Sequence, residues 1–217
     1  MTDPPPQPPA PAPSDDVAFT RWRAAISSLL APAPPLHQEH TAVQEQEHAR
    51  CQKWKAYLLQ HSPIVSFLAT ALPSPLHDSH YVCMPCPPSI SGGFAPQIGI
   101  VLCQNRLVSQ RHMEDTLAHE LVHVYDHETT DVSWARCEQY ACSEIRAAML
   151  SGECRFMREL RRGFVQLNKG HQSCVRRRAA LALSNVPHCQ GENVAEDAIR
   201  NVWAKCFSDT APFDEIY

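Results

Sequence analysis

The chain has 217 residues, of which 44% are hydrophobic and 19% charged, a composition that excludes a wholly disordered protein. Its net charge of −4 is not that of a general nucleic-acid binder. The longest apolar runs, 64–72 and 98–103, are far shorter than the roughly 18 residues that a membrane span needs, and the glycines form no phosphate-binding loop motif.

The first 35 residues are predicted to lie outside the folded domain. They hold ten of the 19 prolines, and residues 1–14 are a low-complexity Pro/Ala/Gln segment. Residues 15–30 are predicted to form a short amphipathic helix, because their apolar residues recur near helical spacing. The start has no apolar core and no arginine before Arg21, so we expect neither a secretory signal nor a mitochondrial transit peptide. A single domain is expected to span residues 36–217.

The body is predicted to be α+β and predominantly helical. Strands are expected at 81–84 and 98–103, of which the second is β-branched and bounded by Pro96 and Asn105. Residues between these strands are expected to form a loop, because they combine prolines with Gly92 and Gly93. Helices are predicted at 37–61, at 63–72, after a turn near Ser109, and at 133–150, 154–167, 171–186 and 192–207.

Ten cysteines are spread through the body, and none lies in the first 35 residues. An even, scattered count favours five disulfides and an oxidising compartment. Structural zinc is less favoured, because Cys83 and Cys86 form a single CxxC pair where a zinc ribbon needs two. Cys137 and Cys142 lie on one predicted helix, and each is expected to bond a different neighbour. The mitochondrial intermembrane space fits an oxidised protein without a secretory signal.

Residues 119–123, His-Glu-Leu-Val-His, form an HExxH motif on a predicted helix. Residues four apart lie about 6 Å apart along the helix axis and about 40° around it, so both imidazoles face one point. Zinc prefers a tetrahedron of ligands, and His119 and His123 supply two of its corners. Glu120 projects beside the same point, where it can act as the catalytic acid/base. The motif therefore predicts a hydrolytic zinc site.

A hydrolytic zinc needs a third protein ligand. Glu144 lies 21 residues after His123, on a later predicted helix that can pack across the first. Asp126 shares a face with His119 but lies about 10.5 Å further along the axis, which a straight helix does not easily bring to one ion. Glu144 is the favoured ligand, and Asp126 or a residue that the sequence does not identify stays an alternative. Asp126 can still orient a histidine ring or another part of the site.

Several further signatures extend over about residues 45–217. They are Cys83-x-x-Cys86 with Gly92-Gly-Phe94, Ile100-x-Leu-Cys103-x-Asn105, His119-Glu-Leu-Val-His-x-x-Asp126, Ala141-Cys-Ser-Glu-Ile-Arg-Ala-Ala148 with Leu150-Ser-Gly-x-Cys154, His171-x-x-Cys174-Val-x-Arg-Arg178 and Cys206-Phe-x-Asp209-x-x-Pro-Phe213. With these signatures the chain resembles the mitochondrial inner-membrane peptidase family that matures subunit 6 of the ATP synthase and helps to assemble its membrane sector.

The resemblance implies a zincin-like metalloendopeptidase with structural disulfides and one catalytic Zn²⁺. Carried over by position, His119 and His123 bind the metal and Glu120 is catalytic. The implied location is the intermembrane-space side of the inner membrane, peripherally attached. The implied function is to remove N-terminal residues from the subunit 6 precursor, with a second role in assembly that does not need proteolysis. The alternatives are a chaperone whose metal site is auxiliary and a cytosolic zinc protease with free thiols.

Two further expectations concern how substrate binds and reacts. The strand at 98–103 is predicted to pair with an extended substrate segment, so that backbone hydrogen bonds set the register. Help for the developing oxyanion is expected from Tyr125, Tyr140 or Arg146, among which the sequence does not choose.

Basic residues gather between Arg155 and Arg178, with Glu159 as the one acid among them. They are interpreted either as solvated helix faces or as a surface for anionic lipid, where each basic residue contributes about 1 kcal/mol. Nucleic acid is disfavoured because no binding module accompanies the cluster. The expected partners are thus the subunit 6 precursor and the membrane sector of the ATP synthase, with anionic lipid as a further candidate.

Overall fold

The computed structural model describes residues 39–161, 163 and 170–214. The predicted helix at 15–30 and the proposed extension at 1–35 lie outside these residues, so both stay predictions. The helices are α2 Glu39–His61, α3 Pro63–Ala71, α4 Gln110–Thr129, α5 Cys137–Leu150, α6 Phe156–Arg161, α7 Gly170–Ser184 and α8 Val194–Ser208. The strands are β1 Tyr81–Met84, β2 Gly92–Ala95 and β3 Gly99–Cys103.

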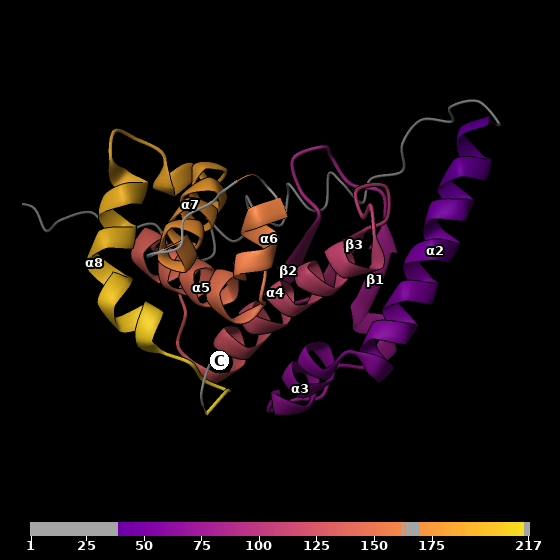
Figure 1. Cartoon of the computed structure of the whole chain (residues 1–217), viewed down its shortest axis with the longest axis horizontal. Helices are drawn as coiled ribbons and strands as arrows, with labels where there is room; N and C mark the ends of the chain where they lie inside the picture. Colours follow the sequence, from indigo (N-terminus) through magenta and orange to yellow (C-terminus); the bar gives the residue numbers. More distant parts are fainter. Residues whose placement is uncertain (1–38, 162, 164–169, 215–217) are drawn as a thin grey trace, which may run out of the picture.

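Helix α4 runs through the middle of the molecule, with the sheet and α2 on one side and α5, α7 and α8 on the other (Figure 1). Its apolar residues, such as Leu117 and Leu121, are completely buried in the main core together with Ile145 of α5. Polar residues on other faces of α4, including Glu120 and His123, are buried as well. A helix buried on several sides is positioned by its neighbours, so its polar side chains point into the protein and not into open solvent.

The sheet has the strand order β1-β3-β2. Strand β1 is parallel to β3, while β2 is antiparallel to it, with Gly93 opposite Val101 and Ala95 opposite Gly99. The prediction of a loop over Gly92–Ala95 was wrong, because backbone pairing to the buried strand β3 overrides the low strand propensity of two glycines. The central strand of the sheet is β3, and β2 is an edge strand beside α4.

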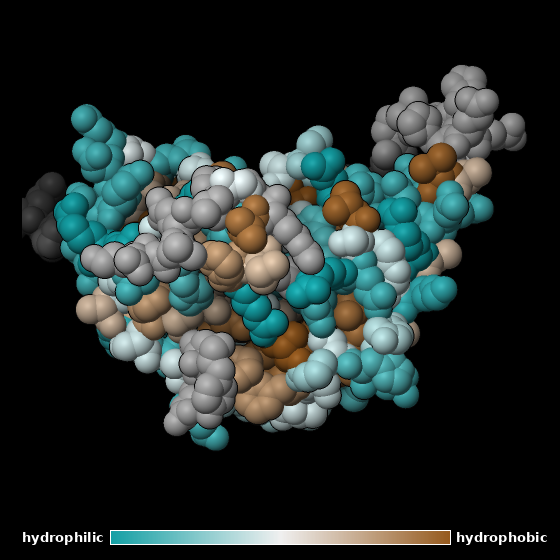
Figure 2. Space-filling view, viewed as in Figure 1, coloured by the Kyte–Doolittle hydropathy of each residue, from teal (hydrophilic) through white to brown (hydrophobic). Residues whose placement is uncertain are grey.

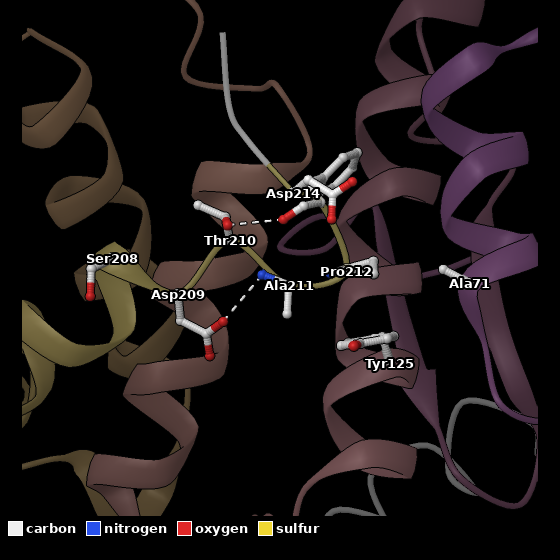
Figure 3. Close-up of a pocket in the computed structure, with 9 residues that line it drawn as sticks. Ala71, Tyr125, Ser208, Asp209, Thr210, Ala211, Pro212 and Asp214 are labelled. Atoms are coloured by element: carbon white, nitrogen blue, oxygen red, sulfur yellow. Dashed lines mark hydrogen bonds between the residues drawn. The ribbon is translucent and has the colours of Figure 1, made fainter.

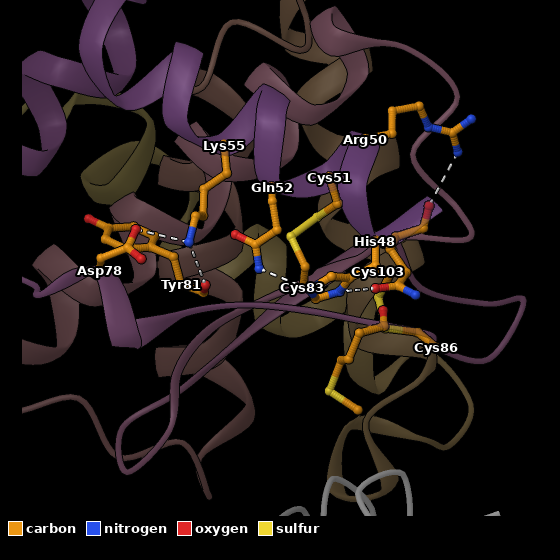
Figure 4. Close-up of a disulfide and its surroundings, with 12 residues drawn as sticks. His48, Arg50, Cys51, Gln52, Lys55, Asp78, Tyr81, Cys83, Cys86 and Cys103 are labelled. Carbon is orange, nitrogen blue, oxygen red and sulfur yellow. Dashed lines mark hydrogen bonds and ion pairs between the residues drawn. A yellow bond between two sulfur atoms is a disulfide. The ribbon is translucent and has the colours of Figure 1, made fainter. Parts of the chain in front are cut away.

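Five disulfides join all ten cysteines, which confirms the expected number. The pairs are Cys51–Cys83, Cys86–Cys103, Cys137–Cys189, Cys142–Cys206 and Cys154–Cys174. Figure 4 shows how the first of them ties α2 to β1, next to the Lys55 ammonium that donates to the Tyr81 carbonyl and pairs with Asp78. As expected, the two cysteines of α5 bond different segments, one in η2 (Pro187–Cys189) and one in α8.

The observed helices start and end close to the predicted bounds, with two clear differences. Helix α6 ends at Arg161, and Gly163 lies in a turn, whereas the predicted helix runs over 154–167. Helix α5 begins at Cys137 and not at Ser133, because Ser133 to Arg136 form a turn in which the Arg136 N–H donates to the Ser133 carbonyl. This turn carries Trp134 toward the site described below. Among the described residues, no helix is both long enough and apolar enough to cross a membrane.

Candidate metal centre

The packing of α5 against α4 brings His119, His123 and Glu144 together. Each offers one metal-binding atom, and these three atoms lie within 4.8 Å of one another. The Glu144 carboxylate lies 3.4 Å from His119 Nε2 through one oxygen and 3.5 Å from His123 Nε2 through the other. The structure thus groups Glu144 with the two histidines, and it places Asp126 elsewhere.

The spacing of these groups fits a divalent metal ion. Distances of 3.4 and 3.5 Å are long for hydrogen bonds between nitrogen and oxygen. They are close to the separation of about 3.4 Å between two ligands of a tetrahedral zinc whose bonds are near 2.1 Å. Glu120, Glu144 and Glu153 are also buried around His119, and this excess of carboxylates favours a bound cation. Three protein ligands would leave a fourth position open for water or substrate.

His123 is oriented from behind by a chain of buried hydrogen bonds. Its Nδ1 lies 2.8 Å from the Ser143 hydroxyl, which in turn donates to Asp126 at 2.8 Å. Because the one hydroxyl hydrogen of Ser143 goes to Asp126, the Ser143 oxygen accepts from Nδ1–H of His123. Burial lowers the pKa of His123 to about 4, so the ring is neutral. The lone pair is therefore on Nε2, toward Glu144, and Asp126 acts on the ring through Ser143.

His119 is oriented by a different carboxylate. Its Nδ1 lies 3.2 Å from Glu153, whose other oxygen pairs with Arg178 at 2.8 Å. Burial opposes protonation of His119, but the carboxylates of Glu144 and Glu153 beside the ring outweigh it and raise the pKa of the metal-free ring. Gly152 makes this arrangement possible, since its φ of 81° is in the left-handed region and turns the chain after α5.

Glu120 lies between the metal-binding group and the edge strand β2. Burial raises the pKa of this carboxyl, the charge of His119 lowers it, and the charges of Glu144 and Glu153 raise it. A hydrogen bond from the Phe94 backbone N–H lowers it again, and the net result is a pKa of about 7. Strand and helix approach closely here: a Cβ on Gly92 would lie 2.6 Å from Thr116 Cγ2. A carboxylate with a pKa near neutrality is suited to accept and return a proton.

An aromatic wall borders the site on the side of the turn before α5. The Trp134 ring lies 5.8 Å from the His123 ring and 5.6 Å from the Tyr140 ring, and it also faces Phe94 of β2. Burial raises the pKa of Tyr140 well above its usual value, and the charges of Glu144 and Glu120 add to this. Tyr140 therefore keeps its proton and can donate a hydrogen bond beside the metal-binding group.

Of the three residues considered for oxyanion help, only Tyr140 is placed against this group. Arg146 points away, since its guanidinium binds Asp126 and Asp209. Tyr125 lines a separate cavity with the segment after α8 (Figure 3). The expectation for Arg146 and Tyr125 is therefore corrected, because tertiary partners decide where long side chains point.

Sequence reasoning missed Ser143, Glu153 and Trp134. Ser143 directly precedes Glu144, and Glu153 is the variable position of the Leu150-Ser-Gly-x-Cys154 signature, so both lie inside the signatures that carry the family resemblance. Their roles depend on which helices cross, which the sequence does not reveal. Trp134 carries no pattern that points to the site.

Three side chains of the basic cluster make contacts within the fold. Arg177 pairs with Glu159 at 2.7 Å, Arg178 pairs with Glu153, and the Arg176 guanidinium lies 3.6 Å from the centre of the Trp203 ring. These three side chains support α7 and the site. The members at 162 and 169 lie outside the described part of the chain.

Two histidines and a glutamate from crossing helices, beside the edge of a small sheet, make this a zincin-like fold with a candidate metal site. Residues 49–214 match the peptidase M76 family, and the chain belongs to that family. It is 40% identical to the mitochondrial inner membrane protease ATP23 of Saccharomyces cerevisiae (strain Lalvin EC1118), over 94% of this chain and 97% of the relative.

Two other fungal relatives carry the same protein name. The protein of Aspergillus clavatus is 42% identical over 94% of this chain and 91% of its own length. That of Kluyveromyces lactis is 43% identical over 81% of this chain and 77% of its own. No solved structure matches the chain.

Proposed function

We propose that the protein is a zinc-dependent endopeptidase whose metal is held by His119, His123 and Glu144. The geometry of this group carries the proposal: two imidazoles and a buried carboxylate offer three metal-binding atoms within 4.8 Å, and Glu120 lies beside them. Membership of a peptidase family supports peptide hydrolysis as the reaction. Zinc is favoured over Mg²⁺ or Ca²⁺ because two imidazoles suit it and all-oxygen sites suit the others.

The residues of the site have separate tasks in this reaction. A zinc ion bound here would supply a Lewis acid and lower the pKa of water to about 7. Glu120 accepts a proton from the attacking water and returns it to the leaving amine. Tyr140 donates a hydrogen bond to the carbonyl oxygen as it gains negative charge. Ser143 and Glu153 hold the two histidine rings in place during these steps.

Substrate is proposed to pair with β2 and not with β3. The expectation for the strand at 98–103 was wrong, because β3 already has a partner on each side. Strand β2 is the edge strand, and the Phe94 N–H points from it to Glu120. An extended peptide added along β2 would therefore pass over the catalytic carboxylate, with backbone hydrogen bonds setting its register.

The protein is placed at the mitochondrial inner membrane, for which its fungal relatives are named. We propose the intermembrane-space side, since five disulfides favour an oxidising compartment. The proposed substrate is the precursor of ATP synthase subunit 6, and the proposed partner is the membrane sector that this subunit enters. Both proposals depend on the resemblance in the sequence signatures.

Peripheral attachment is proposed to use α6 and an anionic lipid surface. Phe156, Met157 and Leu160 of this helix are 47%, 56% and 38% exposed, and apolar residues gather over α6 on the face shown in Figure 2. Basic residues of the same segment are complementary to anionic lipid. They are Arg155, Arg158 and Arg161.

Vesicle flotation tests this attachment. The full chain should float with phosphatidylcholine vesicles that contain anionic phospholipid and should not float with phosphatidylcholine alone. The double variant Phe156→Ser/Met157→Ser should lose binding, while Val43→Ser, which changes an equally exposed residue of α2, should not. Equal flotation of both variants would remove α6 as the lipid-binding surface.

The peptidase proposal is tested with Glu120→Gln in mitochondria that lack the endogenous enzyme. The variant should leave the subunit 6 precursor uncleaved while the purified protein still binds one zinc. Glu45→Gln, an exposed change on α2, is the matched control and should process normally. Assembly of the ATP synthase by the Glu120→Gln variant would show that the assembly role is separable from proteolysis. Undiminished cleavage by that variant would contradict the proposed mechanism.

A further inference from the structure

The segment that follows α8 is connected to the proposed metal site through Arg146. This guanidinium is buried, with the side chain only 5% exposed, and its donors are divided between two parts of the protein. Nε donates to Asp126 at 2.9 Å, whereas the two terminal nitrogens donate to the carbonyls of Asp209 and Ala211 at 2.8 and 2.6 Å. The Asp209 carboxylate forms an ion pair with the same guanidinium.

The path of this segment depends on those contacts. Residues 208–214 border a shallow cavity of about 580 Å³, which Ala71 and Tyr125 line from the opposite side (Figure 3). The segment is attached on one side by α8 and on the other by Phe213, whose ring stacks on Phe67 of α3 at 4.6 Å. With a cavity beside it, the segment is positioned by these attachments and by Arg146.

The same guanidinium fixes Asp126, and Asp126 fixes His123 through Ser143. A buried guanidinium that loses part of its hydrogen bonding becomes costly, so it must shift toward other acceptors. Any such shift moves the Asp126 carboxylate that receives the Ser143 hydrogen. Ser143 would then be free to donate to His123 Nδ1, which places the ring proton on the metal-facing Nε2.

We propose that residues 209–213 are a positioning element of the metal site and that Arg146 is its positioning residue. The inference rests on the proposed metal-binding function. The segment acts on the metal indirectly, because the contacts run from Arg146 to Asp126 and from there through Ser143 to His123. The expected effect is therefore on the affinity for the metal and on the geometry of its coordination. Cleavage activity should follow metal occupancy.

The test measures Zn²⁺ affinity of the full chain by competition with a chromophoric chelator, and the visible spectrum of the Co²⁺-loaded protein. Arg146→Lys keeps the charge but loses the planar fork, and it should weaken Zn²⁺ binding about tenfold and change the Co²⁺ spectrum. Asp209→Asn should weaken binding about threefold. Asp197→Asn is the matched control, because Asp197 is equally exposed and pairs with Arg200 on the surface.

A double-mutant cycle identifies the route. In a Ser143→Ala background, Asp209→Asn should cause no further loss of Zn²⁺ affinity, because the connection to His123 is already broken. Unchanged affinity in both Arg146→Lys and Asp209→Asn, or an undiminished effect of Asp209→Asn in the Ser143→Ala background, would overturn the inference. If Arg146→Lys does not fold, the Zn²⁺ affinity of the Asp209→Asn variant alone tests the inference. Failure of the unmodified chain to bind Zn²⁺ would instead refute the proposed function.

Discussion

The two histidines of the proposed metal site are supported in different ways. Behind His123 lie Ser143, Asp126 and Arg146, all buried, and the charges of this network are compensated inside the protein. Behind His119 lies Glu153, whose partner Arg178 is 39% exposed in its side chain. A buried charge pair is costly to break, whereas a partly exposed one is screened by water. We therefore expect the contacts behind His123 to be rigid and the contacts behind His119 to be adjustable.

Asp126→Asn should have the largest effect, because it breaks the buried support and leaves Arg146 without its internal carboxylate. We expect a loss of about 3 kcal/mol in the free energy of unfolding, together with weaker Zn²⁺ binding. Glu153→Gln should cost clearly less, since Arg178 can return to water. Chemical denaturation of both variants with the disulfides intact measures the difference. Equal losses would show that the two supports do not differ.

Glu120 belongs to neither support, and its burial should destabilise the metal-free protein. Its pKa is raised from 4.5 to about 7 in the folded chain, so the unfolded chain loses its proton first as the pH rises. Below pH 4.5 the group is protonated in both states, and its contribution to the free energy of unfolding is most favourable there. This contribution is lost as the pH rises from 4.5 to about 7. With a chelator present, Glu120→Gln should therefore be more stable than the unmodified chain by about 1–3 kcal/mol at pH 8.

The same comparison at pH 4 is the control for this prediction. There both proteins carry an uncharged group at position 120, and their melting temperatures should agree. A stabilisation that does not depend on pH would mean that the substitution acts through packing and not through the charge.

Gly92→Ala tests the edge strand while both histidine supports stay intact. The added Cβ would lie 2.6 Å from Thr116 Cγ2 and 3.0 Å from the Val101 carbonyl, so β2 must move off α4 near Glu120. Peptide cleavage should fall about tenfold, equivalent to about 1.4 kcal/mol, with Zn²⁺ affinity unchanged. Gly93→Ala is the matched control, since a Cβ there meets no atom within 4 Å. An equal loss in both variants would argue against the close approach at Gly92.

Arg178→Gln should have the smallest effect and should depend on salt. Removing a partly exposed partner of Glu153 should lower stability by less than about 1 kcal/mol, and less still at high ionic strength. Thermal unfolding at low and high salt checks this. A large, salt-independent loss would place Arg178 in the same class as Arg146.

Much of this architecture could be predicted from the sequence because local patterns decide it. Helical spacing located α4 and the pair His119 and His123, and the scattered even count of cysteines predicted five disulfides. The edge strand β2 was missed, since two adjacent glycines have low strand propensity and are recruited only by the partner strand β3.

The supports of the site were less accessible to sequence reasoning. Glu144 was favoured over Asp126 because a straight helix does not bring Asp126 to the same ion, and this argument needs only helix geometry. Ser143 and Glu153 act through contacts between α5, the turn at Gly152 and α4, which exist only after the helices have packed. Disulfide partners were likewise set by helix packing and could not be read from spacing.

X-ray absorption spectroscopy of the zinc-loaded full chain tests the central claim most directly. The account predicts one zinc per chain with only nitrogen and oxygen neighbours near 2.0–2.2 Å, two of them imidazoles, and loss of this zinc in a His119→Ala/His123→Ala variant. Sulfur neighbours near 2.3 Å, or zinc retained by the double variant, would contradict it.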